Sequence, residues 1–140
     1  MTTKFRILVV EGKTHLVQQL QHACVGTEFE VLSCGDRASA LELLRHGKID
    51  LISAEAFMES GLVLEVIRDV REMAHHRGTP IMIVAAEPGP TAEGLLATTA
   101  IASELLGADK FITMRQFDGE WLLAETRALL LSRRALRRSQ

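Results

Sequence analysis

The sequence predicts an α/β fold in which helices cover both faces of a parallel sheet. Short apolar runs rich in β-branched residues alternate with longer segments whose apolar residues recur at helical spacing, in units of about 25 residues. One run, residues 81–86, is apolar throughout, which is typical of a strand buried on both faces. The chain has 140 residues and is 47% hydrophobic, so it can form a single domain around its own core.

Each strand is predicted where a short apolar run is bounded by charged or turn-forming residues. The first run ends at Glu11 and Gly12, and the fourth begins after Pro80 and is broken by the sequence Glu-Pro-Gly-Pro. We expect strands at residues 5–10, 29–33, 49–54, 81–86 and 111–113.

The helices between these strands have recognisable ends. Asp36 is a favourable N-cap for a helix that Gly47 stops. In the segment 62–76, apolar residues such as Val66 share one face, and charged residues including Arg68 and Arg71 lie on the other. We expect five helices, at residues 14–25, between Asp36 and Gly47, and at 62–76, 91–106 and 118–136.

This alternation limits the topology. Strands joined by right-handed helical crossovers allow few arrangements, and the flavodoxin-like strand order 2-1-3-4-5 is the natural one for five units. We therefore predict a flavodoxin-like three-layer sandwich, with residues 1–130 as the domain and 131–140 as a basic C-terminal helix extension or tail. Four arginines lie in this tail, where they suit a helix C-terminus: Arg133, Arg134, Arg137 and Arg138. A linker helix, or a contact with an acidic partner or with nucleic acid, stays open as the alternative.

Charge and targeting signals narrow the function class. The formal net charge is −2, from 16 basic and 18 acidic residues, which argues against a nucleic-acid-binding domain. The first apolar run is too short for a signal peptide or a membrane span. Cys24 and Cys34 fit no redox or zinc spacing, so we expect a cytoplasmic protein with two free thiols.

The topology also predicts where a site would lie. Ligands of such sheets gather at the carboxyl ends of the strands, here marked by Glu11-Gly12, Glu55, Ala85 and Met114. Glu11 and Glu55 would face a common crevice and are weak candidate ligands for magnesium, which prefers near-octahedral oxygen coordination. Two carboxylates alone are few ligands for a metal site. It is equally open that Glu11 and Glu55 are solvent-exposed acids at the starts of loops.

Several segments resemble a known family in their order and spacing. The chain resembles the receiver domain of bacterial response regulators over about residues 4 to 130. The stretch between Ala86 and Gly107 is several residues longer than the family usually has, which suggests a longer loop or helix. The resembling segments are 7–11 (ILVVE), 40–44 (ALELL), 49–52 (IDLI), 79–84 (TPIMIV) and 107–113 (GADKFIT).

The resemblance implies a phosphorylation pocket whose chemical members are replaced. The family's acidic pair after the first strand, which holds magnesium, falls on Glu11 and Gly12. The phosphoacceptor aspartate falls on Glu55, the hydroxyl residue that senses the phosphoryl group on Ala85, and the lysine that pairs with it on Met114. Phosphoryl transfer depends on positioning and on neutralising charge, so this degenerate pocket is expected not to be phosphorylated.

A degenerate receiver, or pseudo-receiver, is therefore expected to act by protein–protein interaction and not as an enzyme. The resemblance implies a contact face made by the fourth helix, the fifth strand and the last helix. The family's aromatic switch position on that face falls on Phe111 and its usual proline on Arg115. The expected partner is a protein, with a homodimer left open; no membrane, nucleic acid or cofactor is expected.

Two other functions stay open, as does one property of Glu55. The chain could be a residual phosphoacceptor that holds magnesium with Glu11 and Glu59, or a small flavodoxin-fold protein that binds a cofactor. Glu55 extends its carboxylate about 1.5 Å, one methylene, beyond an aspartate. It could therefore imitate a phosphorylated aspartate, although Ala85 and Met114 cannot respond to its charge.

Overall fold

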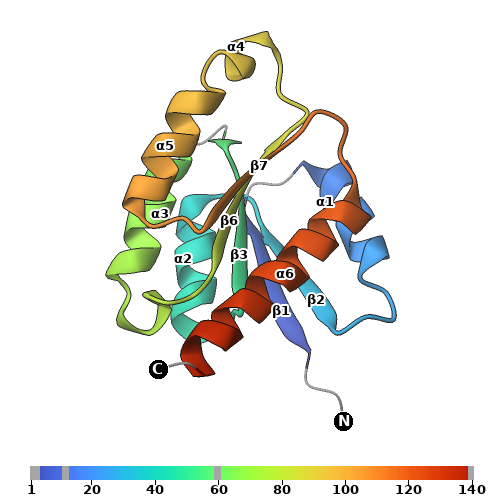
Figure 1. Ribbon diagram of the computed structural model, residues 1–140, viewed down its shortest axis with the longest axis vertical. Coiled ribbons are helices and arrows are strands. Elements are labelled where there is room, and N and C mark those ends of the chain that lie inside the picture. Colours follow the sequence, from blue (N-terminus) through green and yellow to red (C-terminus); the bar gives the residue numbers. More distant parts are fainter. Residues whose placement is uncertain (1–3, 11–12, 59–60, 139–140) are drawn as a thin grey trace.

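The centre of the molecule is a five-stranded parallel sheet (Figure 1). The computed structural model describes residues 4–10, 13–58 and 61–138. The strand order is β2-β1-β3-β6-β7, which reads 2-1-3-4-5 when only these five strands are counted. The strands are β1 (Phe5–Val10), β2 (Phe29–Cys34), β3 (Leu51–Glu55), β6 (Ile81–Ala86) and β7 (Lys110–Met114).

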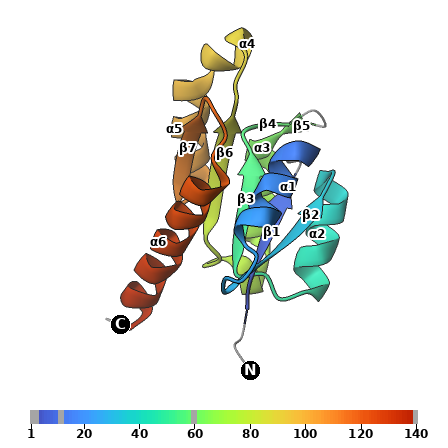
Figure 2. The same cartoon turned by 90° about the vertical axis from the view of Figure 1, so that its right-hand side faces the viewer.

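Helices lie on both faces of the sheet, as predicted (Figures 1 and 2). On one face, α1 (Thr14–Ala23) and α6 (Gly119–Arg138) cover a core that includes Met82 and Met114. On the other, α2 (Arg37–His46) and α3 (Val63–Glu72) cover a core that includes Ile83 and Ala85, and α5 (Leu96–Leu106) packs beside α3. Because β6 is buried at every residue, it supplies side chains to both cores, which explains its uninterrupted apolar sequence.

The predicted caps of α2 are confirmed. The Asp36 carboxylate accepts a hydrogen bond of 2.7 Å from the backbone N–H of Ser39, which satisfies a donor at the start of the helix. Gly47 is the C-cap residue of the same helix. The α1 helix ends at Ala23, two residues before the predicted end, and Gly26 follows with a positive φ of 76°.

The predicted number of five helices is wrong. The described chain contains six α-helices and one 3₁₀ helix, because two predicted helices are each interrupted. The segment 91–106 divides at Gly94 into α4 (Pro90–Glu93) and α5, since glycine is a poor helix former. The segment 62–76 ends its α-helix at Glu72, and the 3₁₀ helix Ala74–His76 follows.

A short hairpin between β3 and α3 was also not predicted. The strands β4 (Phe57–Met58) and β5 (Gly61–Leu62) pair antiparallel to form a second, two-stranded sheet. Strands of two residues are too short to show an alternation of apolar and polar residues, so the sequence gives no signal for them.

The last helix continues beyond the predicted domain boundary at residue 130. The α6 helix runs without a break to Arg138, and the Arg133 side chain donates to the carboxylate of Asp109 at the start of β7. No helix in the described part of the chain is long and apolar enough to cross a lipid bilayer. Cys24 and Cys34 are both in the thiol form, and the Cys34 Sγ–H donates to the carbonyl oxygen of Val9 at 3.7 Å.

Candidate functional site

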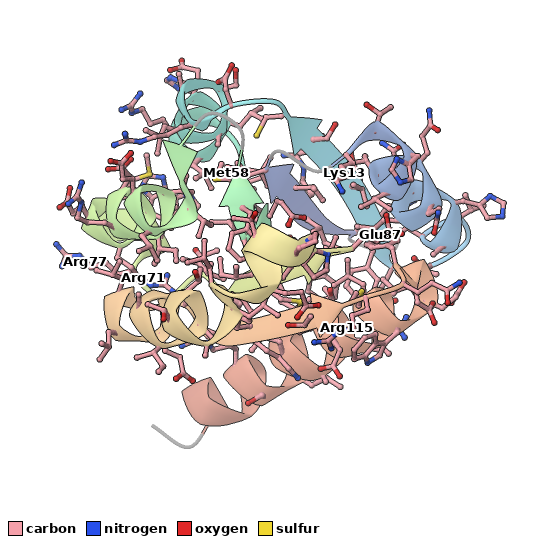
Figure 3. The ribbon with its side chains drawn as sticks, turned by 90° about the horizontal axis from the view of Figure 1, so that it is seen from above. Lys13, Met58, Arg71, Arg77, Glu87 and Arg115 are labelled. Carbon is pink, nitrogen blue, oxygen red and sulfur yellow. The ribbon has the colours of Figure 1, made fainter. Side chains whose placement is uncertain are left out.

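The candidate site lies where β1, β3, β6 and β7 end side by side. Figure 3 looks onto this edge, with Lys13, Met58, Glu87 and Arg115 arranged around it. Strand register places Glu55 beside Val84 of β6 and Ala86 beside Met114 of β7. The predicted site residues Glu11 and Gly12, and the alternative metal ligand Glu59, lie outside the described residues.

Glu55 is a half-buried carboxyl group at the end of β3. It borders a cavity of about 30 Å³ whose other walls are largely apolar, including Val9, Leu16 and Val84. Burial raises the pKa of Glu55 from 4.5 to about 7, against the opposing effects of backbone N–H groups, chiefly that of Ala86, and of the Lys13 charge. The Ala86 N–H donates to Oε1 of Glu55 at 3.3 Å. At neutral pH a large fraction of the molecules therefore carries an uncharged Glu55.

The positions that the resemblance assigns to the hydroxyl and the lysine are both apolar and buried. Ala85 is 0% exposed and packs in the core beneath α2 and α3. Met114 is 1% exposed and packs in the opposite core, beneath α1 and α6. Neither side chain can donate a hydrogen bond or supply a positive charge at the pocket.

Thr113 does not compensate for the missing hydroxyl. It pairs in register with Ala85, two strands away from Glu55. Successive side chains of a strand point to opposite faces, so Thr113 lies on the face that carries Phe111, whereas Glu55 lines the cavity beneath α1.

The sequence analysis missed Glu87, which joins three segments at the rim of the pocket. It has a positive φ of 49°, and its N–H donates to the Met114 carbonyl oxygen at 2.7 Å. Its carboxylate accepts from the Phe117 N–H at 3.5 Å and lies 3.6 Å from His15 Nε2. In the sequence Glu87 only begins a strand-breaking Glu-Pro-Gly-Pro segment, so nothing there indicates this role.

The described residues do not make a magnesium site by themselves. No group of three or more His, Cys, Asp or Glu side chains suited to a metal occurs among them. Of the candidate ligands, only Glu55 is described, and its raised pKa makes it a weaker ligand near neutrality because metal binding requires the ionised form.

The two residues assigned to the contact face lie on the side of α4 and α5. Phe111 is half-buried and packs against the core beneath α2 and α3. Arg115 is exposed, and its guanidinium donates to both carboxylate oxygens of Glu93 in α4, at 3.0 and 3.1 Å. This pair ties the end of β7 to α4.

The α5 helix exposes an unusual amount of apolar surface. Ser103 is its only buried residue, while the side chains of Ile101 and Leu105 are 61% and 83% exposed. Leu95, just before the helix, and Leu106 at its end are also exposed. Exposed apolar residues grouped on one element are typical of a contact surface.

Solved structures share this fold, although no model of a known protein family and no curated protein matches the sequence. A putative response regulator from Chloroflexus aurantiacus has a TM-score of 0.75 at 17% identity, covering 92% of this chain and 99% of that one. The chemotaxis response regulator CheY4 of Vibrio cholerae has a TM-score of 0.74 at 20% identity, covering 91% and 99%.

A third match is the signal receiver domain of an HD domain-containing protein from Pseudomonas fluorescens. Its TM-score is 0.76 at 18% identity, and the match covers 100% of this chain and 96% of that one. The resemblance seen in scattered sequence segments is therefore matched by the arrangement of strands and helices. The chain has the fold of the receiver domains of response regulators.

Proposed function

We propose that this chain is a receiver-type module that acts in signal transduction by binding a protein, without conventional phosphorylation of an aspartate. The observation that carries the proposal is the composition of the pocket. A half-buried glutamate stands at the acceptor position, with Ala85 and Met114 at the positions of the hydroxyl and the lysine.

Each replacement removes a physical requirement of phosphoryl transfer. The transferred group carries negative charge, which a cation normally neutralises, and a buried methionine cannot do so. The added methylene of Glu55 shifts the attacking oxygen, and misplacement by about 1 Å can already cost a large factor in rate.

The properties of Glu55 also argue against a permanent imitation of the phosphorylated state. Such an imitation requires a fixed negative charge and groups that respond to it. With a pKa of about 7, Glu55 is uncharged in many molecules at neutral pH. Ala85 and Met114 have no polar hydrogen with which to respond. A pocket with one fixed conformation fits these residues better.

The α5 surface is the best candidate for the protein contact. Ile101 and Leu105 lie one helical turn apart, so their exposed side chains form a continuous apolar strip. The Arg115–Glu93 ion pair lies at the end of β7 and in α4, before the start of α5, so charged groups flank that end of the helix.

Treatment with acetyl phosphate and magnesium is expected to leave the protein unmodified, as measured by intact-protein mass spectrometry. A receiver domain with the usual aspartate and lysine, treated in parallel, provides the positive control. A phosphoryl adduct that forms on this protein and is lost in Glu55→Gln would contradict the proposal.

The double substitution Ile101→Asp/Leu105→Asp is expected to abolish binding to the protein partner while changing the free energy of unfolding by about 0.5 kcal/mol or less per site. Both side chains are largely exposed, so the fold does not depend on them. Partner binding is measured by cross-linking in extracts of cells that express the chain. Gln18→Asp/Gln19→Asp on exposed α1 positions is the matched control. Equal capture by the two variants would rule out α5 as the contact surface.

A further inference from the structure

A second cavity lies at the opposite edge of the sheet, where the strands begin. Its volume is about 470 Å³, and it is enclosed by the starts of β1, β3 and β6 and by the last part of α6. Figure 1 shows this edge at the bottom, where the two ends of the chain also lie. The volume falls within the range of about 300–1,000 Å³ that is typical of small-molecule sites.

Among the ionisable residues that line this cavity, basic residues outnumber acidic ones. Lys4, Lys48, His75 and Arg133 contribute to it, and Asp50 is its only acidic residue. The Asp50 carboxylate already accepts a hydrogen bond of 2.8 Å from the backbone N–H of Arg6. Arg133 is paired with Asp109. In the described part of the chain, neither Lys4 nor Lys48 has a carboxylate partner, which leaves two exposed cations at the cavity.

The conformation of His75 is fixed by the protein. His75 Nε2 and His76 Nε2 lie 3.0 and 2.8 Å from the same acceptor, the carbonyl oxygen of Leu44. Since a carbonyl oxygen only accepts, both Nε2 atoms must carry a hydrogen. In the neutral ring the Nδ1 atom of His75 is then a hydrogen-bond acceptor, which suits a donor group of a ligand.

Apart from Thr79, the remaining walls are apolar. Phe5, Pro80 and Leu130 line the cavity together with Ile49. A basic rim next to an aromatic ring and aliphatic side chains suits a ligand that has both an anionic group and a flat apolar group.

We propose that this cavity binds a small phosphorylated ligand with a planar aromatic ring, the chemical class to which nucleotides belong. The phosphate would lie between Lys4 and Lys48, and the planar group against Phe5 and Pro80. This cavity lies at the far edge of the sheet from Glu55, and no residue of α5 lines it, so the proposal is independent of the proposed function.

Isothermal titration calorimetry with AMP, GMP, CMP and UMP, and separately with inorganic phosphate, tests the proposal. At least one nucleotide is expected to bind saturably, about tenfold or more tightly than inorganic phosphate. Lys4→Ala/Lys48→Ala is expected to weaken that binding by about tenfold or more, because it removes two charged donors. Arg68→Ala/Arg77→Ala removes the same charge from exposed positions outside the cavity and is expected to leave binding unchanged.

Three results would overturn the proposal. These are the absence of saturable binding by every nucleotide, equal affinity for nucleotide and inorganic phosphate, and equal binding by the two double variants. Equal affinity would mean that the apolar wall is not recognised, and equal binding by the variants would mean that the cavity is not the site.

Discussion

Replacing Glu55 by glutamine is expected to stabilise the protein by up to about 3 kcal/mol at pH 8 and to change its stability little at pH 4. The pKa of Glu55 is about 7 in the folded protein, against 4.5 for an ordinary glutamate. The folded state therefore holds this proton more tightly than the unfolded state. Stability from the protonated group is fully present below pH 4.5 and is lost as the pH rises through about 7.

Urea denaturation of both proteins across this pH range measures the difference. The gap between the wild type and Glu55→Gln should open above pH 4.5 and level off above pH 7. Glu104→Gln, a change of the same chemistry at an exposed position on α5, provides the control and should show no such pH-dependent gap. A constant difference between wild type and Glu55→Gln at every pH would mean that burial does not perturb this carboxyl.

Replacing Arg71 by methionine is expected to lower the free energy of unfolding by about 3–5 kcal/mol. Its side chain is only 17% exposed and donates to the carbonyl oxygens of His76, Thr79 and Gly107. It also pairs with Asp109 at 3.1 Å. Methionine fills much of the same volume but donates nothing, so it would leave three carbonyl oxygens and a carboxylate without this donor.

The backbone at Gly107 leaves space for the Arg71 side chain. Gly107 has a positive φ of 113°, and a Cβ atom there would lie 3.0–3.3 Å from atoms of the Arg71 side chain. Arg68→Met, at an exposed position in the same helix, is the matched control and should cost about 0.5 kcal/mol or less. Chemical denaturation compares the two variants, and a similar small loss in both would show that the Arg71 contacts contribute little.

The five strands of the main sheet were predictable because each is a short apolar run in the local sequence. For β1 and β6 the predicted bounds, 5–10 and 81–86, are the observed ones. The N-cap residue Asp36 correctly predicts the start of α2. The break at Gly94 was missed because the apolar residues around it continue a helical pattern. Arg71 was predicted on the outer face of its helix. In the structure it points inward and donates to carbonyl groups of the turn before β6 and of Gly107 at the end of α5.

The candidate site was predictable only in its composition. The resemblance to receiver domains identified Glu55, Ala85 and Met114, but not the burial that raises the pKa of Glu55, because that burial comes from α1 and β6. The sequence around Glu87 does not indicate its contacts, because these depend on a positive φ at a residue in a loop. The exposed strip on α5 was hidden as well, because an apolar helix sequence by itself predicts burial.

The central claim, that the pocket cannot hold a phosphoryl group, is tested most directly by titrating the protein with magnesium and beryllofluoride, a phosphoryl analogue, and following amide NMR shifts. We expect no saturable shifts at Glu55, Ala86 or Met114. The positions assigned to the hydroxyl and the lysine hold Ala85 and Met114, and the acceptor is not fully ionised. Saturable shifts that centre on these residues and require both magnesium and beryllofluoride would contradict the claim and identify a working phosphoryl site.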